Sequence, residues 1–416
     1  MAKKGLKYLV VGAGKMGEAI AYDLAQQNDT GAVRIIDSAR IKDKPNSSKA
    51  EELAKRLGNP QIEGYKVDAS DESHLRGFMK ESDVAIGAAS YELNLGLSYA
   101  AIETGTHFCD LGGNNTVVRR QFELSNEARE KKVKIMPDTG ITPGAVSIIA
   151  AHGIERIRKA GLSGKKGYPD YLRIRVGGLP QDPKGTLQYQ IVFSVQGLIN
   201  EYIEPVEILK GGKRETVEGM SGLEKNIIFT NVCGSEAMIF EAAHTSGGAS
   251  TLIETYKGKI KELDCKTLRF PGHFEKVRLL HELGFFDSEF FTGRNIIHPS
   301  YMDPESFSPR KMTEQLLEKK LSYKGRDMLL LRLSLGKGRK EFRYEMKDYF
   351  DEETGHTAMQ RTTGYSAAII ARTMAKNQVK SFGTLRQEKN VPAELFIREW
   401  KKRNLLLTER ILDKQV

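Results

Sequence analysis

The chain has 416 residues, a formal net charge of +10, three cysteines and 39% hydrophobic residues. This length suffices for two or three packed domains, and no stretch approaches the roughly 20 apolar residues that a membrane span needs. Lys and Arg are scattered among acidic residues, so we expect a cytoplasmic protein with a mixed, solvated surface and neither a nucleic-acid nor a membrane partner. The wide spacing of the cysteines predicts neither a disulfide framework nor a metal site at Cys109, Cys233 and Cys265.

Between Leu6 and about Pro137, short β-branched runs alternate with segments of helical spacing, which is typical of βαβ units on a parallel sheet. We predict strands at Lys7–Val11, Val33–Ile36, Gly64–Val67, Asp83–Gly87, His107–Asp110 and Val133–Met136. Apolar residues at helical spacing predict helices at Glu51–Leu57, Leu93–Glu103 and Arg120–Glu130. These elements make a complete α/β domain, a doubly wound Rossmann fold with a parallel sheet, over residues 1–142.

After Pro143 the pattern changes to a helix at Ala145–Arg156, longer strands and two hairpin signals, Gly211-Gly212 and Gly336-Lys337-Gly338. We therefore predict a second, α+β domain with a largely antiparallel sheet over residues 143–361. Two further helices, Thr362–Lys376 and Ala393–Arg403, predict a C-terminal segment, residues 362–416, that packs back on the first domain. Its charged end, Thr408–Val416, is expected to be a frayed tail or a helix.

The segment Gly12-Ala13-Gly14-Lys15-Met16-Gly17 follows the first predicted strand and opens a helix. In this context Gly12 permits the tight turn, Gly14 lets the backbone approach a pyrophosphate, and Gly17 lets the helix and strand pack closely. The helix that begins at Lys15 and Met16 would present its free N–H groups to the phosphates. We interpret the segment as a dinucleotide-binding loop rather than a plain βα turn.

Two acidic residues end the next strands. Asp37 lies about twenty residues after Gly17, where a carboxylate can accept hydrogen bonds from the ribose hydroxyls and would repel a 2′-phosphate. It therefore predicts NAD in preference to NADP, although a capping role for Asp37 is the alternative. Asp68 could meet the adenine or cap the following helix.

Three further segments follow the remaining strands, at the edge where open α/β sheets bind ligands. Ala88-Ala89-Ser90 could lie against the nicotinamide ribose, with Tyr91 projecting into a cleft. Asp110-Leu111-Gly112-Gly113 follows the fifth strand. Asp138-Thr139-Gly140 follows the sixth, and a single such triplet cannot supply the two carboxylates of an aspartic protease.

Two segments of the second domain carry polar groups. His244-Thr245-Ser246-Gly247-Gly248 is dense in hydrogen-bonding groups, and is interpreted as either a polar site or a helix cap before Ser250. Arg269 ends a strand in Thr267–His273 and could clamp a carboxylate with two hydrogen bonds or serve as a structural ion-pair partner.

Taken in order, these motifs resemble the saccharopine dehydrogenase-like family and, within it, the lysine 6-dehydrogenase group. The resemblance covers roughly residues 6–375, whereas Phe285–Arg310 and the chain after Gln378 match it poorly. It implies an active site in a cleft between a Rossmann domain and a substrate domain, and assembly as a homodimer or larger homo-oligomer.

The resemblance implies NAD-dependent oxidation of the ε-amine of L-lysine to a semialdehyde that cyclises, with release of ammonia. His244 has the intrinsic pKa of a general base, while Tyr91 and Asp110 could orient the amine or a water molecule. Arg269 could hold the α-carboxylate, with Thr245, Gly112 and Gly113 beside the substrate.

Two alternatives stay open. An NADP-dependent saccharopine reductase of the same fold is disfavoured by Asp37, and by the segment His244-Thr245-Ser246 where such enzymes present an Asn-Arg-Asp type of sequence. A non-catalytic NAD-binding regulator would sense a ligand in the cleft without converting it.

Overall fold

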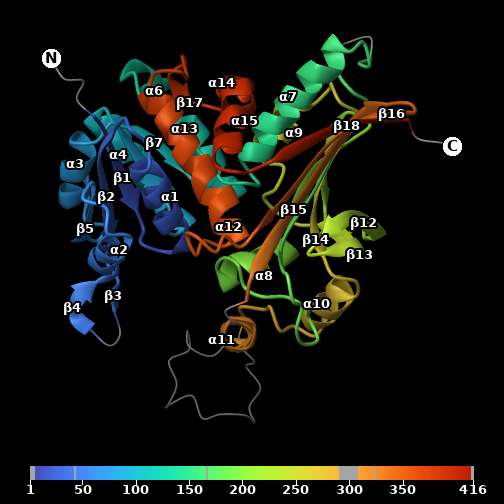
Figure 1. Cartoon of the computed structure of the whole chain (residues 1–416), viewed down its shortest axis with the longest axis horizontal. Helices are drawn as coiled ribbons and strands as arrows, with labels where there is room; N and C mark the ends of the chain where they lie inside the picture. Colours follow the sequence, from blue (N-terminus) through green and yellow to red (C-terminus); the bar gives the residue numbers. More distant parts are fainter. Residues whose placement is uncertain (1–4, 42–43, 165–166, 290–307, 323–324, 414–416) are drawn as a thin grey trace.

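A computed structural model describes residues 5–41, 44–164, 167–289, 308–322 and 325–413. Two large sheets lie beside each other, with helices on both faces of the first and the long strands of the second on the right of Figure 1. Most of residues Phe285–Arg310 fall outside the described ranges.

The first sheet has seven strands in the order β17-β8-β7-β6-β1-β2-β5, and every neighbouring pair is parallel. The strands are β1 Leu6–Val11, β2 Thr30–Asp37, β5 Ile62–Lys66, β6 Val84–Gly87, β7 His107–Asp110, β8 Lys134–Met136 and β17 Gly383–Thr384. All six predicted strands are confirmed. The chain reverses direction across the sheet between β1 and β6, so the loops that follow these two strands lie at the topological switch point where open α/β sheets bind ligands.

The apolar run of β1 is continuous because both faces of the sheet are covered. Tyr8 and Val10 pack in one hydrophobic cluster, and Leu9 and Val11 in another on the opposite face. The covering helices are α1 Lys15–Ala25, α2 Lys49–Leu57, α3 Glu72–Lys80, α4 Asn94–Thr104, α5 Asn115–Glu123 and α6 Ser125–Glu130. The predicted helix Arg120–Glu130 is therefore divided between α5 and α6.

The second sheet has nine strands, and β14–β9 is its one parallel pair among the described strands. Its strands are β9 Tyr171–Pro180, β10 Val206–Lys210, β11 Lys213–Val217, β12 Glu224–Val232, β13 Ser235–His244, β14 Glu262–Arg269, β15 Asp327–Lys337, β16 Lys340–Tyr349 and β18 Leu407–Asp413. The predicted, largely antiparallel sheet is confirmed. Gly211 and Gly212 join β10 to β11 as expected, whereas pairing of Lys337 with Lys340 places the other turn at Gly338-Arg339.

The helices around this sheet are α7 Ala145–Lys159, α8 Val195–Ile203, α9 Thr251–Tyr256, α10 His273–Glu282 and α11 Pro309–Leu321. The C-terminal helices are α12 Ala358–Gln360, α13 Ser366–Ala375, α14 Gln387–Asn390 and α15 Ala393–Lys402, and a π-helical turn, Arg361–Tyr365, joins α12 to α13. A small separate sheet pairs β3 Arg40–Ile41 with β4 Lys44–Ser48.

The C-terminal segment contacts both sheets. Strand β17 adds to the first sheet beside β8, and α13 packs against the same sheet. Strand β18 instead pairs with β16 of the second sheet (Figure 1). The prediction of a tail or helix at Thr408–Val416 is therefore wrong over the described residues, because the open edge of β16 satisfies the backbone N–H and C=O groups of this segment.

Candidate active site

The three glycines of the loop after β1 differ in their surroundings. Gly12 has a φ of +114°, and a Cβ there would lie 2.7 Å from the carbonyl oxygen of Ala88. A Cβ on Gly17 would lie 1.9 Å from the carbonyl oxygen of Gly12, so these two glycines are required by the fold. Gly14 has no atom within 4 Å of a Cβ position and is exposed. The missing side chain of Gly14 leaves space for a ligand that approaches from solvent.

The N-terminus of α1 is open to a ligand. Gly14 is the N-cap residue and supplies no side chain to the first N–H groups of the helix, which therefore remain available to an anion. The side chain of Lys15 is exposed at the same end. The Gln360 side-chain amide donates to the carbonyl of Lys15 (3.0 Å), and a Cβ on Gly364 would lie 3.3 Å from the carbonyl oxygen of Met16. The π-helical turn thus packs against the start of α1.

Asp37 lies directly beside the glycine loop. One carboxylate oxygen accepts a hydrogen bond from the N–H of Ala13 (2.8 Å), and the other accepts one from the N–H of Ala39 (2.7 Å). These two bonds fix the half-buried carboxylate at the end of β2. The Asp37 carboxylate is therefore held next to the glycine loop, at the carboxyl edge of the first sheet.

Asp68 follows β5 and is exposed. Its carboxylate accepts hydrogen bonds from the N–H and the hydroxyl of Ser70, at 2.9 and 2.7 Å. These bonds lower the pKa of Asp68. The cap of α3 is Asp71, so Asp68 stabilises a local turn rather than the helix terminus.

The loops after β6 and β7 meet at Tyr91. Ala88 is half-buried and its N–H donates to the carbonyl of Val11 (2.8 Å), whereas Ala89 and Ser90 are exposed. Tyr91 is half-buried, and a Cβ on Gly113 would lie 3.4 Å from its ring.

Asp110 is fully buried at the end of β7. Its carboxylate accepts hydrogen bonds from the N–H of Gly112 (2.8 Å) and from the side-chain amide of Gln121 (2.7 Å). Burial raises its pKa to about 6, although these bonds favour the charged form. The bond to Gly112 indicates that Asp110 stabilises the turn at Gly112 and Gly113.

Asp138 was not among the residues predicted for the site, yet it joins the two domains there. It is 1% exposed at the end of β8 and has a φ of +62°. The hydroxyl of Ser250, just before α9, donates to one carboxylate oxygen. A Cβ on Gly112 would lie 1.8 Å from the other, so the glycine makes room for the acid. Burial raises the pKa of Asp138 to about 7.

His244 ends β13 within a group of charged residues on the second sheet. Its Nε2 lies 3.6 Å from the Asp264 carboxylate, and its Nδ1 lies 3.2 Å from the hydroxyl of Ser221. Asp264 also accepts two hydrogen bonds from Arg175. Burial opposes ionisation of Asp264, but the His244 bond and the Arg175 charge hold its pKa well below the usual range. Nδ1 of His244 is therefore within hydrogen-bond distance of Ser221, whereas Nε2 makes a longer ion-pair contact with Asp264.

The segment after His244 ties the second sheet to α8. The hydroxyls of Thr245 and Thr267 are 2.6 Å apart, and the N–H of Ser246 donates to the carbonyl of Glu201 (2.9 Å).

Arg269 is enclosed at the end of β14, with 2% of its surface exposed. Its guanidinium carbon lies 4.6 Å from the ring centroid of Tyr189 and 5.6 Å from that of Tyr202. Nε donates to the Tyr202 hydroxyl (3.0 Å) and Nη1 to the carbonyl of Leu268 (2.9 Å). Nη2 faces the Glu201 carboxylate at 3.7 Å. Burial raises the pKa of Glu201 to about 7.

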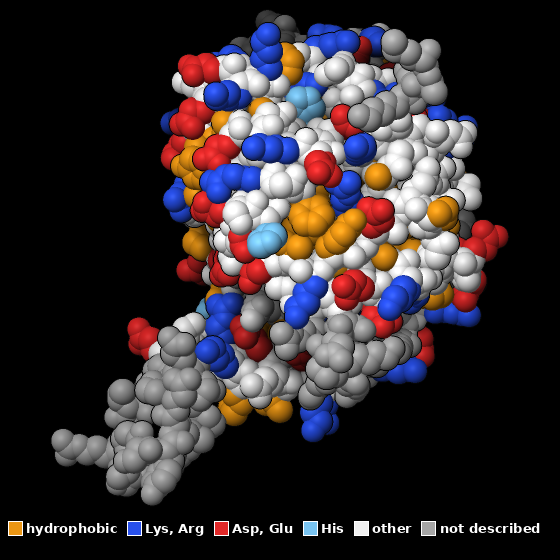
Figure 2. All heavy atoms as spheres, turned by 90° about the vertical axis from the view of Figure 1, so that its left-hand side faces the viewer, with side chains coloured by type: hydrophobic (Ala, Val, Ile, Leu, Met, Phe, Trp, Pro, Cys, Tyr) orange, Lys and Arg blue, Asp and Glu red, His pale blue; other side chains and the backbone are white. Residues whose placement is uncertain are grey.

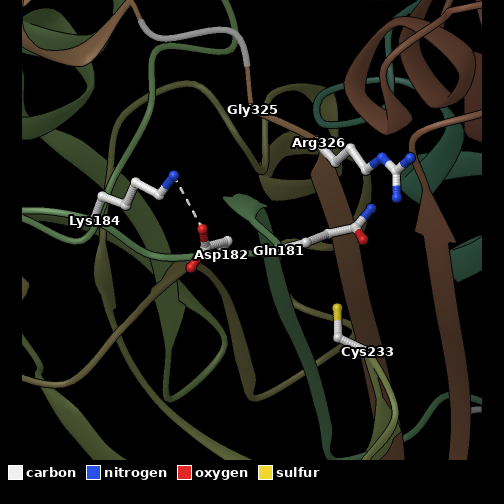
Figure 3. A pocket seen from close by; sticks show the side chains of 6 residues that line it. All are labelled: Gln181, Asp182, Lys184, Cys233, Gly325 and Arg326. Atoms are coloured by element: carbon white, nitrogen blue, oxygen red, sulfur yellow. Dashed lines mark ion pairs between the residues drawn. The ribbon is translucent and has the colours of Figure 1, made fainter.

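A separate surface pocket of about 400 Å³ lies where β9 ends and β15 begins (Figure 3). Its lining residues are Gln181, Asp182, Lys184, Cys233, Gly325 and Arg326. The pocket carries an ion pair between Lys184 and Asp182 (3.1 Å). It contains none of the predicted site residues.

Two further observations concern partners and metals. On the face shown in Figure 2, Lys and Arg side chains are interspersed with Asp and Glu. Among the described residues, no helix is long and apolar enough to cross a membrane, and no group of three or more His, Cys, Asp or Glu could hold a metal ion.

Comparison with known proteins accounts for nearly the whole chain. The family model of the saccharopine dehydrogenase NADP binding domain matches residues 8–141, and that of the saccharopine dehydrogenase C-terminal domain matches residues 140–405. The chain belongs to the saccharopine dehydrogenase family. Its first domain is the nicotinamide dinucleotide-binding domain of this family.

Its similarity to individual family members is moderate. It is 25% identical over 299 residues to the L-glutamate-forming, NADP(+) saccharopine dehydrogenase of Saccharomyces cerevisiae, across 68% of this chain and 59% of that protein. The enzyme of the same name from Pyricularia oryzae is 24% identical over 249 residues, across 57% of this chain and 51% of its own length. The alignments thus span little more than half of each curated relative.

The solved apo structure of the S. cerevisiae saccharopine dehydrogenase has the same fold. It superposes with a TM-score of 0.75 at 19% identity, and the match covers 98% of this chain and 100% of that chain. The Rossmann sheet followed by a largely antiparallel second sheet is therefore the fold of the saccharopine dehydrogenase family.

Within this family fold, the predicted site residues fall into separate groups. The loops that carry Gly14, Asp37, Ala88 and Tyr91 lie together at the carboxyl edge of the first sheet, whereas Arg269 is enclosed by side chains of the second domain. Asp138 and Glu201 were missed. The position of Asp138 after the sixth strand could have indicated it, but no pattern in the sequence marks Glu201.

Proposed function

We propose that this enzyme uses NAD to oxidise the ε-amine of L-lysine. The observation that carries the cofactor preference is the Asp37 carboxylate, held beside the glycine loop by the N–H groups of Ala13 and Ala39. A fixed negative charge at this position favours two free ribose hydroxyls and repels a 2′-phosphate. Replacing this charge should therefore reduce the discrimination between NAD and NADP.

The residues of the loops at the carboxyl edge of the first sheet fit a dinucleotide. The space beside Gly14 and the uncapped start of α1 suit a pyrophosphate, with Lys15 and Met16 at the same helix end. Ala88, Ala89 and Ser90 would line the nicotinamide ribose, and Asp68 would border the adenine. Bound NAD supplies the hydride acceptor.

The reaction proposed for lysine is a hydride transfer followed by hydrolysis of the resulting imine. The C–H bond at Cε breaks with transfer of a hydride, and the ε-nitrogen loses a proton to form a C=N bond. Water then adds to this carbon, and ammonia leaves to give the semialdehyde, whose aldehyde condenses with the α-amine to a cyclic imine and releases water.

Three side chains are candidates for the proton steps. We favour Tyr91 as the group that contacts the reacting amine or water, because it is half-buried beside Gly113 between two cofactor-edge loops. Asp110 would act through the backbone of Gly112. His244 would have to release Asp264 or Ser221 before it could accept a proton from the substrate. Thr245, Gly112 and Gly113 would border the substrate.

A second candidate function is oxidation of saccharopine with NADP. Two observations support it: both curated relatives are NADP(+) saccharopine dehydrogenases, and residues 8–141 match the saccharopine dehydrogenase NADP binding domain. The assembly is proposed to be a homodimer or larger homo-oligomer in either case, and the protein is proposed to be cytoplasmic.

The test is a matrix of two cofactors and two substrates. Formation of NADH or NADPH is measured by absorbance with L-lysine or L-saccharopine, and mass spectrometry identifies the product. We expect NADH, ammonia and the cyclised semialdehyde with lysine. We also expect Asp37→Ser to shrink the preference for NADH over NADPH in direct binding titrations by roughly 10-fold or more, the effect of losing hydrogen bonds to a charged group.

Asp83→Ser is the matched control for Asp37→Ser. The Asp83 carboxylate also accepts a backbone N–H bond, from Lys7 (2.8 Å), but it lies at the opposite edge of the sheet. This variant should keep the cofactor preference. Turnover of saccharopine with NADP and none of lysine would establish the second candidate instead, whereas ligand binding without turnover of any amino acid would favour a regulator.

A further inference from the structure

The Glu201–Arg269 pair is incompletely bonded. Arg269 donates through Nε and Nη1, but its Nη2 is 3.7 Å from the Glu201 carboxylate, beyond hydrogen-bond distance. That contact is the one polar contact of the Glu201 carboxylate within the described part of the chain. Glu201 keeps 31% of its side-chain surface exposed, whereas Arg269 keeps 2%. The pair is therefore open to solvent on the Glu201 side.

The two charges match the head group of an amino acid. An α-amino acid carries a carboxylate and an ammonium on one carbon, so an adjacent guanidinium and carboxylate can bind both. We propose that Arg269 holds the α-carboxylate and Glu201 the α-ammonium of the substrate, an inference that rests on the function proposed above. Binding would replace one long ion-pair contact by two sets of charge-assisted hydrogen bonds.

The surrounding side chains hold the Arg269 guanidinium in one orientation. The rings of Tyr189 and Tyr202 flank it, and the Tyr202 hydroxyl bonds to Nε. The Tyr202 hydroxyl is in turn 2.9 Å from Nε2 of His273. An orientation fixed before binding lowers the entropy lost when the carboxylate binds.

One short segment connects the pair to the first sheet. Glu201 is bonded through its carbonyl to the N–H of Ser246, and the Ser250 hydroxyl bonds to Asp138 beside Gly112. Three residues separate Ser246 from Ser250, so the Cα atoms of the two serines lie at most about 14 Å apart. This short segment connects the Glu201–Arg269 pair to Asp138 at the carboxyl edge of the first sheet, where the cofactor loops lie.

The test measures binding without turnover. L-norleucine, hexanoate and pentylamine are titrated by calorimetry into the full chain saturated with NADH; the last two lack the α-amine and the carboxylate of norleucine, respectively. We expect the wild type to bind norleucine at least 10-fold more tightly than hexanoate. Glu201→Gln should reduce this ratio by roughly 10- to 100-fold, because the amide cannot pair with an ammonium ion. Its affinity for hexanoate should change little.

Glu207→Gln is the matched control, since Glu207 lies on β10 of the same domain as Glu201 and pairs with Arg119 (2.6 Å), which belongs to α5 of the first domain. It should leave the norleucine-to-hexanoate ratio unchanged. A Glu201→Gln variant that keeps the ratio, or weakens both ligands equally, would overturn the proposal.

Failure of this proposal is distinguishable from failure of the proposed function. A Glu201-dependent preference for norleucine in a protein that does not oxidise lysine would support the head-group site and reject the lysine reaction. Oxidation of lysine together with a norleucine-to-hexanoate ratio that Glu201→Gln leaves unchanged would reject the head-group site alone.

Discussion

Single residues of the glycine loop have separable roles. The absent Cβ of Gly17 prevents a backbone clash within the fold, whereas that of Gly14 leaves space open to solvent. Gly14 also has ordinary backbone angles, with φ −79° and ψ −175°. The two glycines therefore allow folding and cofactor binding to be tested apart.

We expect Gly14→Ala to keep the melting temperature of the wild type within a few degrees and to weaken NADH binding roughly 10-fold or more, because the methyl group blocks approach of the pyrophosphate. Gly17→Ala should instead destabilise the protein by about 3 kcal/mol or more, or prevent folding. Thermal melts and fluorescence titration with NADH measure the two effects. Equal NADH affinity of Gly14→Ala and the wild type would place the pyrophosphate elsewhere.

Asp138 links the site to the pH dependence of stability. Burial raises its pKa from 3.8 to about 7, with the nearby Asp110 and Glu388 carboxylates acting in the same direction and the Ser250 bond opposing it. Below about pH 4 both the folded and the unfolded chain carry the proton. Between pH 4 and 7 only the folded chain keeps it, so the contribution of Asp138 to stability falls as the pH rises through this window.

Asp138→Asn should remove this loss of stability at higher pH, because the amide does not titrate and can still accept the Ser250 hydrogen bond. We expect similar unfolding free energies for variant and wild type near pH 4.5, and a variant that is more stable by about 2–4 kcal/mol at pH 8. Urea unfolding at both pH values measures the difference. A difference that does not change with pH would show that Asp138 is ionised throughout.

At the scale of elements, the C-terminal helix and the last strand differ in how they are buried. Phe396 and Trp400 of α15 are fully buried in the main hydrophobic cluster, and Leu405 follows them with 1% exposure. Strand β18 instead adds to an open sheet edge, and most of its side chains are exposed.

A chain that ends at Leu405 should therefore fold and bind NADH like the full chain, with a modest loss of stability and a greater tendency to associate through the uncovered edge of β16. A chain that ends at Pro392 lacks Phe396 and Trp400, whose removal costs about 3–5 kcal/mol each, and should not accumulate as folded protein. Melting curves, NADH titration and size-exclusion chromatography test both. Loss of NADH binding in the chain that ends at Leu405 would show that β18 supports the first domain.

At the scale of the molecule, one hydrophobic cluster joins the two sheets. It contains Tyr8 and Val10 of β1 together with Leu172 of β9 and Leu331 of β15. An ion pair adds to this connection: Arg119 of α5 bonds to Glu207 of β10 (2.6 Å). The proposed domain limits, 1–142, 143–361 and 362–416, therefore mark changes of architecture along the chain within a shared core.

The sequence by itself determined the parts of this protein that depend on local patterns. The six β-branched runs and the helices between them specify a parallel sheet, because a βαβ unit has one favoured hand and its side-chain periodicity is local. The glycine loop and Asp37 follow from the same rule, since the carboxyl ends of parallel strands meet at one edge. The family motifs in the second half indicated a saccharopine dehydrogenase-like fold before any contact was known.

Only the tertiary structure decided which distant side chains meet. It placed His244 beside Asp264 and Ser221, Asp138 beside Ser250, and Glu201 beside Arg269. It also made a strand of Leu407–Asp413, although the charged sequence indicated a tail or helix. These outcomes depend on packing between segments far apart in the chain and on the open edge of β16, and neither leaves a periodic signal in the sequence.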